Sequence, residues 1–252
     1  MKILVPVSGG KDSQACLKLA IDEAGSENVR GLFCDTQFEH EITYEHVHRL
    51  GDLYGVRIDW VCAGSVEEKV KKYKRFPGGG ARHCTKELKI IPTKKYLKKL
   101  AEEIGGFEVW YGMRTEESAE RANRYQNTID DELYQPHEIN GNYPKYLGNL
   151  GVRFRLPILE WTKGEVLAFL EGNENPLYGF GFDRVGCFPC LAAGDYHKEK
   201  AFTFDETGQR HFKIARGLEE YTGRSVFTSK RGQLKNDSGQ QDCFQGCGIC
   251  AI

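Results

Sequence analysis

Short apolar runs alternate with amphipathic segments through the first 115 residues of the chain. Runs rich in β-branched residues predict strands, and apolar residues three or four positions apart predict helices. The predicted strands cover residues 3–7, 29–34, 56–62, 107–113 and 152–159, and the predicted helices cover residues 11–24, 39–54 and 92–104. Such alternation is typical of parallel βαβ units. We therefore expect a doubly wound α/β fold, with a mostly parallel sheet and helices on both of its faces.

The strand and helix pattern weakens after residue 172. Just before that point, Thr162 and Glu165 form a capping box, which predicts a short helix over residues 166–170. The remainder is rich in Gly, Phe and Cys, and residues 228–246 are polar enough to be a mobile segment. We expect an α/β domain over residues 1–172 and a Cys-rich C-terminal region over residues 173–252.

Composition excludes two classes of protein. The chain has 252 residues, of which 40% are hydrophobic, so it is long and apolar enough to form a globular core and is not disordered throughout. It contains no run of 18 apolar residues, and its apolar start is too short for a signal sequence. These features predict a soluble cytoplasmic protein that has no membrane partner.

The net charge of −1 argues against a globally basic nucleic-acid binder, but the charge is unevenly distributed. Residues 69–99 contain twelve Lys or Arg residues and one acidic residue. Lysines 94–99 are expected to form a solvated helix face. Residues 69–75 predict an anion-facing surface as readily as a solvated one, because clustered positive charge attracts phosphate-bearing partners such as nucleic acids.

Nine cysteines in a chain without an export signal favour thiol, metal or cluster chemistry over disulfides. Cys187 and Cys190 form one C-x-x-C pair, and Cys247 and Cys250 form another. Three others occur in apolar stretches and are predicted to be small core residues: Cys16, Cys34 and Cys62. His46 and His48, on the second predicted helix, are expected to face solvent rather than bind a metal.

The segment Ser8-Gly9-Gly10-Lys11-Asp12-Ser13 stands between a predicted buried strand and an amphipathic helix. Its two glycines let the backbone approach a phosphate closely, and the helix N-terminus presents unpaired N–H groups. Lys11 and the serines add further donors. The segment predicts a phosphate-binding turn, with a serine-capped tight turn as the purely structural alternative. It matches neither G-x-x-x-x-G-K-[ST] nor G-x-G-x-x-G.

This S-G-G-K-D-S segment resembles the PP-loop of the ATP pyrophosphatases and sulfonucleotide reductases. Further motifs narrow the resemblance to the phosphoadenosine phosphosulfate (PAPS) reductase family, within the adenine nucleotide α-hydrolase-like superfamily. They are D-T at 35–36, R-x-C at 82–84, G-x-R-x-x-E-S-x-x-R at 112–121, P-I-x-x-W-T at 157–162 and G-C-x-P-C at 186–190. The resemblance spans residues 3–190 and implies the fold of that superfamily.

The resemblance also implies which residues contact the nucleotide. Ser8 through Ser13 are expected to hold its phosphates, and Asp35 is expected to lie beside the adenosine. Arg114 and Arg121 are expected at a phosphate or at the transferred group, because guanidinium forks suit such oxyanions. The alternative for both arginines is an ion pair with an acid on a loop surface.

In the cluster-bearing reductases, two adjacent cysteines precede the C-x-x-C pair. Here Cys84 matches the first of them and Thr85 replaces the second, so three positions match the family: Cys84, Cys187 and Cys190. A 4Fe-4S cluster on three thiolates leaves one iron open to sulfide, to substrate or to a tail cysteine such as Cys250. A structural zinc ion would use the same ligands.

Residues 246–250 resemble the C-terminal E-C-G-[IL]-H of the reductases, in which the cysteine is the nucleophile. Gly246 replaces the glutamate and Cys250 replaces the histidine. Cys247 therefore remains open as a nucleophile, a ligand or a simple tail cysteine, and Cys250 as a metal ligand or a resolving thiol.

The resemblance and the Lys11–Asp12 pair together predict an ATP-dependent enzyme of sulfur transfer. A substrate oxygen attacks the α-phosphorus of magnesium-bound ATP, pyrophosphate leaves, and sulfide or persulfide then displaces AMP. Lys11 stabilises the pyrophosphate, Asp12 positions metal or lysine, and the cluster supplies sulfur. The expected partners are a nucleotide, a sulfur acceptor, and a sulfur or electron donor protein.

Two alternatives belong to other classes. In a sulfonucleotide reductase, the Cys247 thiolate would attack the sulfate sulfur of a bound phosphosulfate, and external thiols would then release sulfite. In a non-catalytic nucleotide- or nucleic-acid-binding module, zinc would only brace the fold, and binding would weaken steeply with salt.

Overall fold

The computed structural model describes residues 1–78, 82–130 and 132–230. Cys243, Cys247, Cys250 and most of the segment predicted to be mobile lie outside the described residues. The chain divides into two compact units, each assembled from separate segments. The first unit comprises Met1–Cys34, Ile42–Val61 and Ile90–Val185, and the second comprises Asp35–Glu41, Cys62–Lys89 and Gly186–Ile252. The predicted domains, residues 1–172 and 173–252, are instead continuous in sequence, and their boundary stays a prediction.

The central sheet has five strands in the order β3-β2-β1-β4-β5. Their bounds are Ile3–Val7 for β1, Val29–Asp35 for β2, Arg57–Cys62 for β3, Glu108–Trp110 for β4 and Arg153–Arg155 for β5. β1 pairs in parallel with β2 and with β4, and β4 pairs in parallel with β5. The chain thus extends the sheet to one side of β1 first and then to the other, which creates a switch point between β1 and β4.

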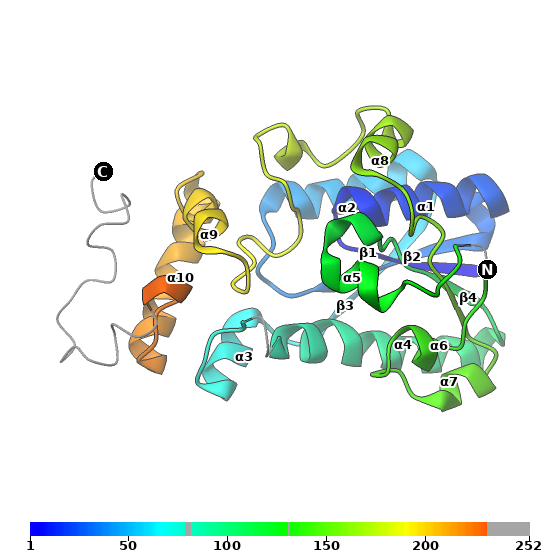
Figure 1. The fold of residues 1–252 in the computed structure, drawn as a ribbon, viewed down its shortest axis with the longest axis horizontal. Helices are drawn as coiled ribbons and strands as arrows, with labels where there is room; N and C mark the ends of the chain where they lie inside the picture. Colours follow the sequence, from blue (N-terminus) through cyan, green and yellow to red (C-terminus); the bar gives the residue numbers. More distant parts are fainter. Residues whose placement is uncertain (79–81, 131, 231–252) are drawn as a thin grey trace. The chain divides into compact units, whose positions relative to one another are not determined.

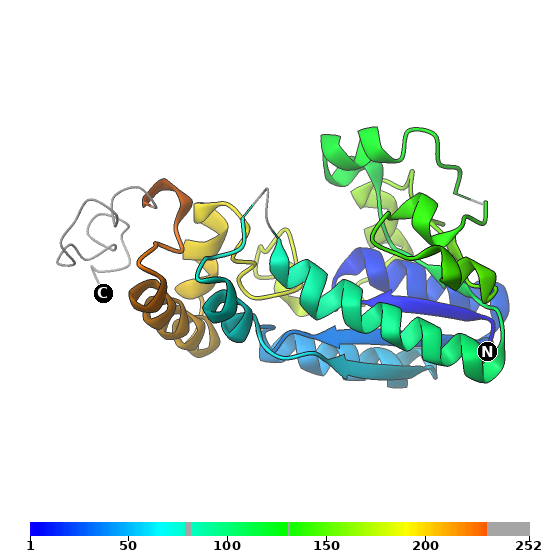
Figure 2. The ribbon, with the colours of Figure 1, turned by 90° about the horizontal axis from the view of Figure 1, so that it is seen from below.

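Helices cover both faces of this sheet (Figures 1 and 2). One face carries α1 (Lys11–Ala24), α2 (Glu41–Tyr54) and α8 (Lys163–Leu170), and the other carries α4 (Ile91–Ile104), α6 (Pro136–Ile139) and α7 (Lys145–Asn149). Successive side chains of β1 point to opposite faces of the sheet, so they pack against different helix layers. Val5 belongs to the apolar core that includes α1, and Leu4 to the core that includes α4. The predicted doubly wound α/β fold is confirmed.

The second unit has a separate apolar core, to which Phe38, Val70, Phe202 and Leu218 contribute. Its helices are α3 (Val66–Tyr73), a π-helix η2 (Thr85–Ile90), α9 (Asp195–Phe202), α10 (Glu206–Thr222) and the 3-10 turn η5 (Thr228–Lys230). The remaining elements are η1 (Ser26–Asn28), η3 (Thr115–Glu117), α5 (Ala119–Arg124) and η4 (Pro176–Tyr178). Within the described ranges, no helix is both long and apolar enough to cross a membrane.

Two predictions about side-chain exposure are wrong. His46 is only 3% exposed, because it faces α1 and forms a hydrogen bond with Gln14, whereas its neighbour His48 is exposed as expected. Cys62 is exposed rather than a core residue, since it is the last residue of the edge strand β3. Cys16 is buried as predicted.

Candidate functional site

The segments after β1 and β4 meet at the switch point of the sheet. In open parallel sheets, ligands bind at such a point, beyond the carboxyl ends of the strands. Gly112, after β4, lies directly against the start of α1, because a Cβ at this position would stand 2.3 Å from the carbonyl oxygen of Asp12. Only glycine permits this approach, so the motif around Gly112 and the PP-loop form one site.

The PP-loop forms a tight turn between β1 and α1, and its N-cap is Gly10 rather than a serine. Gly9 has a φ of +74°, which favours glycine, and Gly10 is the N-cap of α1. The Ser13 hydroxyl accepts a hydrogen bond from Ser8 N at 3.0 Å and donates one to the Gly10 carbonyl at 2.9 Å. Lys11 is the first residue of the helix. The loop therefore presents the first N–H groups of α1 toward the site.

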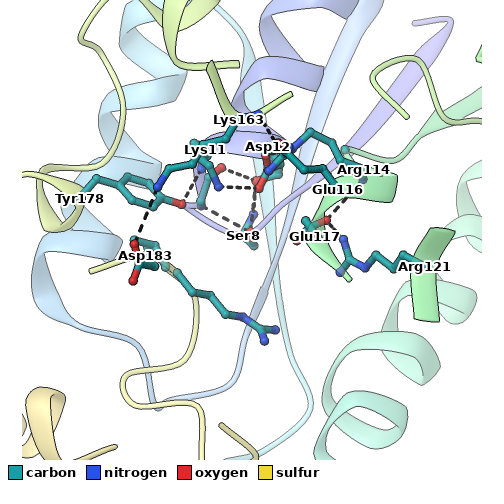
Figure 3. Close-up of a pocket in the computed structure, with 15 residues that line it drawn as sticks. Ser8, Lys11, Asp12, Arg114, Glu116, Glu117, Arg121, Lys163, Tyr178 and Asp183 are labelled. Carbon is teal, nitrogen blue, oxygen red and sulfur yellow. Dashed lines mark hydrogen bonds and ion pairs between the residues drawn. The ribbon is translucent and has the colours of Figure 1, made fainter. Parts of the chain in front are cut away.

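A pocket of about 460 Å³ opens in front of this loop (Figure 3). This volume lies within the usual range for small-molecule sites. The pocket is lined by Ser8, Gly10, Lys11, Asp12, Ser13, Gly112, Arg114, Glu116, Glu117, Arg121, Lys163, Tyr178, Asp183, Arg184 and Val185. Five of these side chains are basic and four are acidic. Such a lining suits an anionic ligand that also carries a cation.

At the N-terminus of α1, Asp12 forms ion pairs with both Lys11 and Arg114. The Lys11 ammonium lies 3.1 Å from Asp12 Oδ2, and Arg114 Nε lies 2.6 Å from Asp12 Oδ1. Arg114 also donates to Glu116 and to the Trp161 carbonyl, and its side chain is 3% exposed. Burial opposes its charge, but the hydrogen bonds and charge of Asp12 and Glu116 outweigh burial, so the pKa of Arg114 is raised. Arg114 thus positions Asp12 through a buried ion pair rather than one on a loop surface, and the phosphate contact predicted for Arg114 remains a proposal.

Arg121 lies at another side of the pocket and forms an ion pair with Glu117. Burial lowers the pKa of Arg121, and the charge of Arg184 lowers it further. Two like charges in one pocket favour the binding of an anion between or beside them. The anionic contact predicted for Arg121 remains a proposal.

Four ionisable residues of the pocket lie outside every motif quoted from the sequence: Lys163, Tyr178, Asp183 and Arg184. Lys163 donates its backbone N–H to Glu116 at 2.6 Å, and its ammonium lies 3.7 Å from Asp183. The only local signal was the capping box that begins at Thr162, which places Lys163 at the N-terminus of α8. The other three follow no motif and reach the pocket through the tertiary fold.

Asp35 and the three predicted thiolate ligands lie in the second unit. Asp35 accepts the N–H of Gln37 at 2.7 Å, which stabilises the turn after β2. The Cys187 thiol lies 3.4 Å from the Thr36 hydroxyl and 3.6 Å from the carboxylate of Glu39, which is 4% exposed. The C-x-x-C hairpin is thus held by the segment that follows β2.

The Cys190 thiol interacts electrostatically with the thiols of both Cys84 and Cys187. Burial, with a smaller contribution from Cys190, raises the pKa of Cys187 to about 12, and the same two causes raise the pKa of Cys84. Among the described residues, no three His, Cys, Asp or Glu side chains are arranged to hold a single metal ion. Thiolates are ligands of both zinc ions and iron–sulfur clusters, so the residues present fit either group.

A doubly wound parallel sheet with S-G-G-K-D-S at its switch point defines the class of PP-loop α/β proteins. Within that class, the family model of the phosphoadenosine phosphosulfate reductase domain matches residues 2–193. The chain belongs to this family.

Relatives of the chain include proteins of archaea and bacteria. An uncharacterised protein of Methanocaldococcus jannaschii is 32% identical over 203 residues, which are 79% of this chain and 38% of that protein. Adenosine 5'-phosphosulfate reductase 1 of Bacillus subtilis is 26% identical over 173 residues, which are 64% of this chain and 62% of that protein. The chain thus spans less than two thirds of either relative.

A solved structure shares the fold. The PAPS reductase of Candida auris, crystallised as a phosphate complex, matches with a TM-score of 0.50 at 18% identity, over 75% of this chain and 82% of that one.

Proposed function

We propose that this protein is an ATP-dependent PP-loop enzyme that cleaves ATP at the α-phosphate to activate a substrate for sulfur transfer. The observation that carries the proposal is the Lys11–Asp12 pair inside the pocket. The Lys11 side chain is 6% exposed and ends 3.1 Å from Asp12. An ammonium held beside the first N–H groups of α1 suits the charge that grows on departing pyrophosphate.

The chain's own residues have distinct parts in this reaction. A substrate oxygen attacks the α-phosphorus, the bond to pyrophosphate breaks, and Lys11 and the loop N–H groups stabilise the charge on the leaving group. Asp12, fixed by Arg114, orients the lysine. Magnesium bound with ATP would neutralise further phosphate charge. Sulfide or persulfide then forms the carbon–sulfur bond as AMP departs with the substrate oxygen.

Cys84, Cys187 and Cys190 are proposed to hold a 4Fe-4S cluster. When bound, such a cluster would offer an iron without a protein thiolate, at which sulfide can be carried. In the alternative arrangement, Cys250 or Cys247 would occupy that iron as a fourth ligand in place of sulfide. The cleavage of ATP itself uses only residues of the first unit.

The basic residues 69–99 are proposed to contact a nucleic-acid substrate. Their free charge is smaller than the sequence suggests, because Lys71 pairs with Glu67 and Lys72 with Glu87. Binding through this segment would weaken as salt rises.

A sulfonucleotide reductase is the second candidate. It is favoured by the Bacillus subtilis relative and by the Candida auris structure, which are reductases of adenosine and phosphoadenosine phosphosulfate. In this reaction Cys247 would form a bond to the sulfate sulfur and release the nucleotide, and a second thiol would then release sulfite.

Nucleotide binding is tested by titrating ATP and magnesium into the wild type and into two lysine variants. Lys11→Ala removes the pocket ammonium, and we expect ATP affinity to fall by at least tenfold. Lys18→Ala is the matched control, since Lys18 lies on the same helix but does not line the pocket. Equal affinity in the wild type and both variants would remove Lys11 from the site.

The two reactions are separated by their products. The wild type is incubated with magnesium-ATP, and separately with adenosine phosphosulfate and phosphoadenosine phosphosulfate, in each case with total tRNA, sulfide and thiols present. We expect pyrophosphate from ATP. Sulfite from a phosphosulfate, with ATP left intact, would instead establish the reductase.

A further inference from the structure

Tyr178, the last residue of η4, occupies a position at the PP-loop that no sequence motif announces. Its hydroxyl accepts a hydrogen bond from the backbone N–H of Lys11 at 3.0 Å, across 167 positions of the chain. The Lys11 ammonium lies 5.3 Å from the centre of the Tyr178 ring. Figure 3 shows Tyr178 beside Lys11, on the side away from Arg114. The Tyr178 side chain therefore lies against both the backbone N–H and the ammonium of Lys11.

The Lys11 N–H is the donor that a phosphate would be expected to use. It belongs to the first turn of α1, whose N–H groups have no partner within the helix. Such groups bind phosphate oxygens. The phenol oxygen thus occupies the place in front of this donor that a phosphate oxygen would take.

The tyrosine hydroxyl is neutral in this position. Burial raises the pKa of Tyr178 to about 12, so the phenol keeps its proton at neutral pH. A neutral acceptor forms a weaker hydrogen bond with an N–H than a phosphate oxygen does. A bound phosphate is therefore favoured over the phenol for this donor.

The segment that carries Tyr178 is fixed to the site by other contacts. Asn175, which is fully buried, donates to the carbonyl of Gly9 at 3.1 Å and accepts the N–H of Leu177 at 3.0 Å. Gln14 donates to the carbonyl of Asn173 at 2.8 Å. None of these bonds involves the phenol, so all of them can persist when the phenol leaves the Lys11 N–H.

We propose that Tyr178 is a displaceable stand-in for a ligand phosphate: an oxygen of the nucleotide's phosphate takes over the Lys11 N–H, and the phenol moves off it. The inference rests on the proposed nucleotide site and adds a residue that sets its affinity. Breaking the phenol contact opposes binding, whereas a chain that lacks the hydroxyl has no such contact to break.

The test compares Tyr178→Phe with the wild type, using ATP with magnesium and inorganic pyrophosphate as probes. Phenylalanine keeps the ring but removes the acceptor. We expect both probes to bind about three- to tenfold more tightly, which corresponds to one net hydrogen bond of roughly 0.7–1.4 kcal/mol. Tyr146→Phe is the control, because Tyr146 is 44% exposed on α7 and does not line the pocket. It should bind as the wild type does.

A second measurement follows the Lys11 amide without ligand. In Tyr178→Phe its hydrogen exchange should be faster than in the wild type, and thermal melting should confirm that the variant is folded. Unchanged or weaker probe binding in Tyr178→Phe, with ATP bound by the wild type, would overturn the role of Tyr178 and leave the nucleotide site standing. If the wild type binds neither probe, both the proposed function and this inference fail.

Discussion

Arg114 Nε lies 2.6 Å from Asp12 Oδ1, so a residue after β4 holds a residue of the PP-loop that is 102 positions away. The other carboxylate oxygen of Asp12 faces the Lys11 ammonium. Arg114 thereby determines where the carboxylate of Asp12 stands, and through it the position of Lys11. The site depends on a contact between the loops that follow two neighbouring strands.

Arg114→Lys should weaken both folding and ATP binding. Lysine keeps the positive charge, but its ammonium lacks the planar set of N–H donors with which Arg114 reaches Asp12, Glu116 and the Trp161 carbonyl. Because the Arg114 side chain is 3% exposed, we expect a loss of about 3 kcal/mol in the free energy of unfolding, and at least a tenfold loss in ATP affinity. Denaturant unfolding and ATP titration measure these effects.

The control for Arg114→Lys is Arg124→Lys. Arg124 pairs with Glu120 on α5, and its side chain is 53% exposed, so its replacement should cost less than about 0.5 kcal/mol. If Arg114→Lys proved as stable as this control, Arg114 would not hold the loop.

Gly112→Ala should destabilise the first unit. The added Cβ would stand 2.3 Å from the Asp12 carbonyl oxygen, a backbone atom that cannot rotate away. We expect a loss of about 1–3 kcal/mol in unfolding free energy, as in other overpacked sites. Gly217→Ala is matched to it, since its Cβ would meet no atom within 4 Å on α10. Gly217→Ala should raise the free energy of unfolding by up to about 1 kcal/mol, because alanine favours a helix interior more than glycine does. Equal effects of the two changes would contradict the close approach.

His46 should make stability depend on pH between about 4 and 6.5. Burial, the larger cause, and the charge of Arg49 together lower its pKa from the ordinary value to about 4. With Nε2 bonded to Gln14 at 2.9 Å, a second proton would sit on Nδ1, which has no hydrogen-bond partner among the described residues. The unfolded chain therefore binds the proton first as pH falls, and the protein loses stability.

Above pH 6.5 the stabilisation from neutral His46 is fully present. As the pH falls from 6.5 to about 4, the free energy of unfolding should decrease by on the order of 3 kcal/mol. His46→Gln should reduce the slope of unfolding free energy against pH in this window. His48→Gln, at the exposed neighbouring histidine, should retain it. A wild-type slope that persists in His46→Gln would assign the proton to another group.

Cys187→Ser should remove most of the iron from anaerobically purified protein. The expected readouts are metal analysis and the loss of the broad absorbance near about 400 nm that clusters give. Cys62→Ser is the control, because Cys62 is exposed and is not among the proposed ligands. Colourless wild-type protein with one bound zinc ion would contradict the cluster and favour a bracing role for the C-x-x-C pair.

The elements closest to their predictions are those with local signals. β1 and α1 have the predicted bounds, since a β-branched run precedes two glycines and Gly25 ends the helix. The capping box at Thr162 is present as predicted. β5 is shorter than predicted, at Arg153–Arg155, because only those residues pair with β4. α10 was missed, although Asp205 caps it and Ala215 and Leu218 lie on its buried face.

The pattern of apolar residues determined the doubly wound sheet, and the two glycines of S-G-G-K-D-S determined where the tight turn between β1 and α1 would lie. Both follow from neighbours in the chain, whose spacing sets local structure and the face that is buried. Only the tertiary structure decided that Arg114 forms an ion pair with Asp12, that the Tyr178 hydroxyl accepts the Lys11 N–H and that His46 is buried. Those contacts join residues far apart in sequence, and no local pattern specifies which distant side chains folding will bring together.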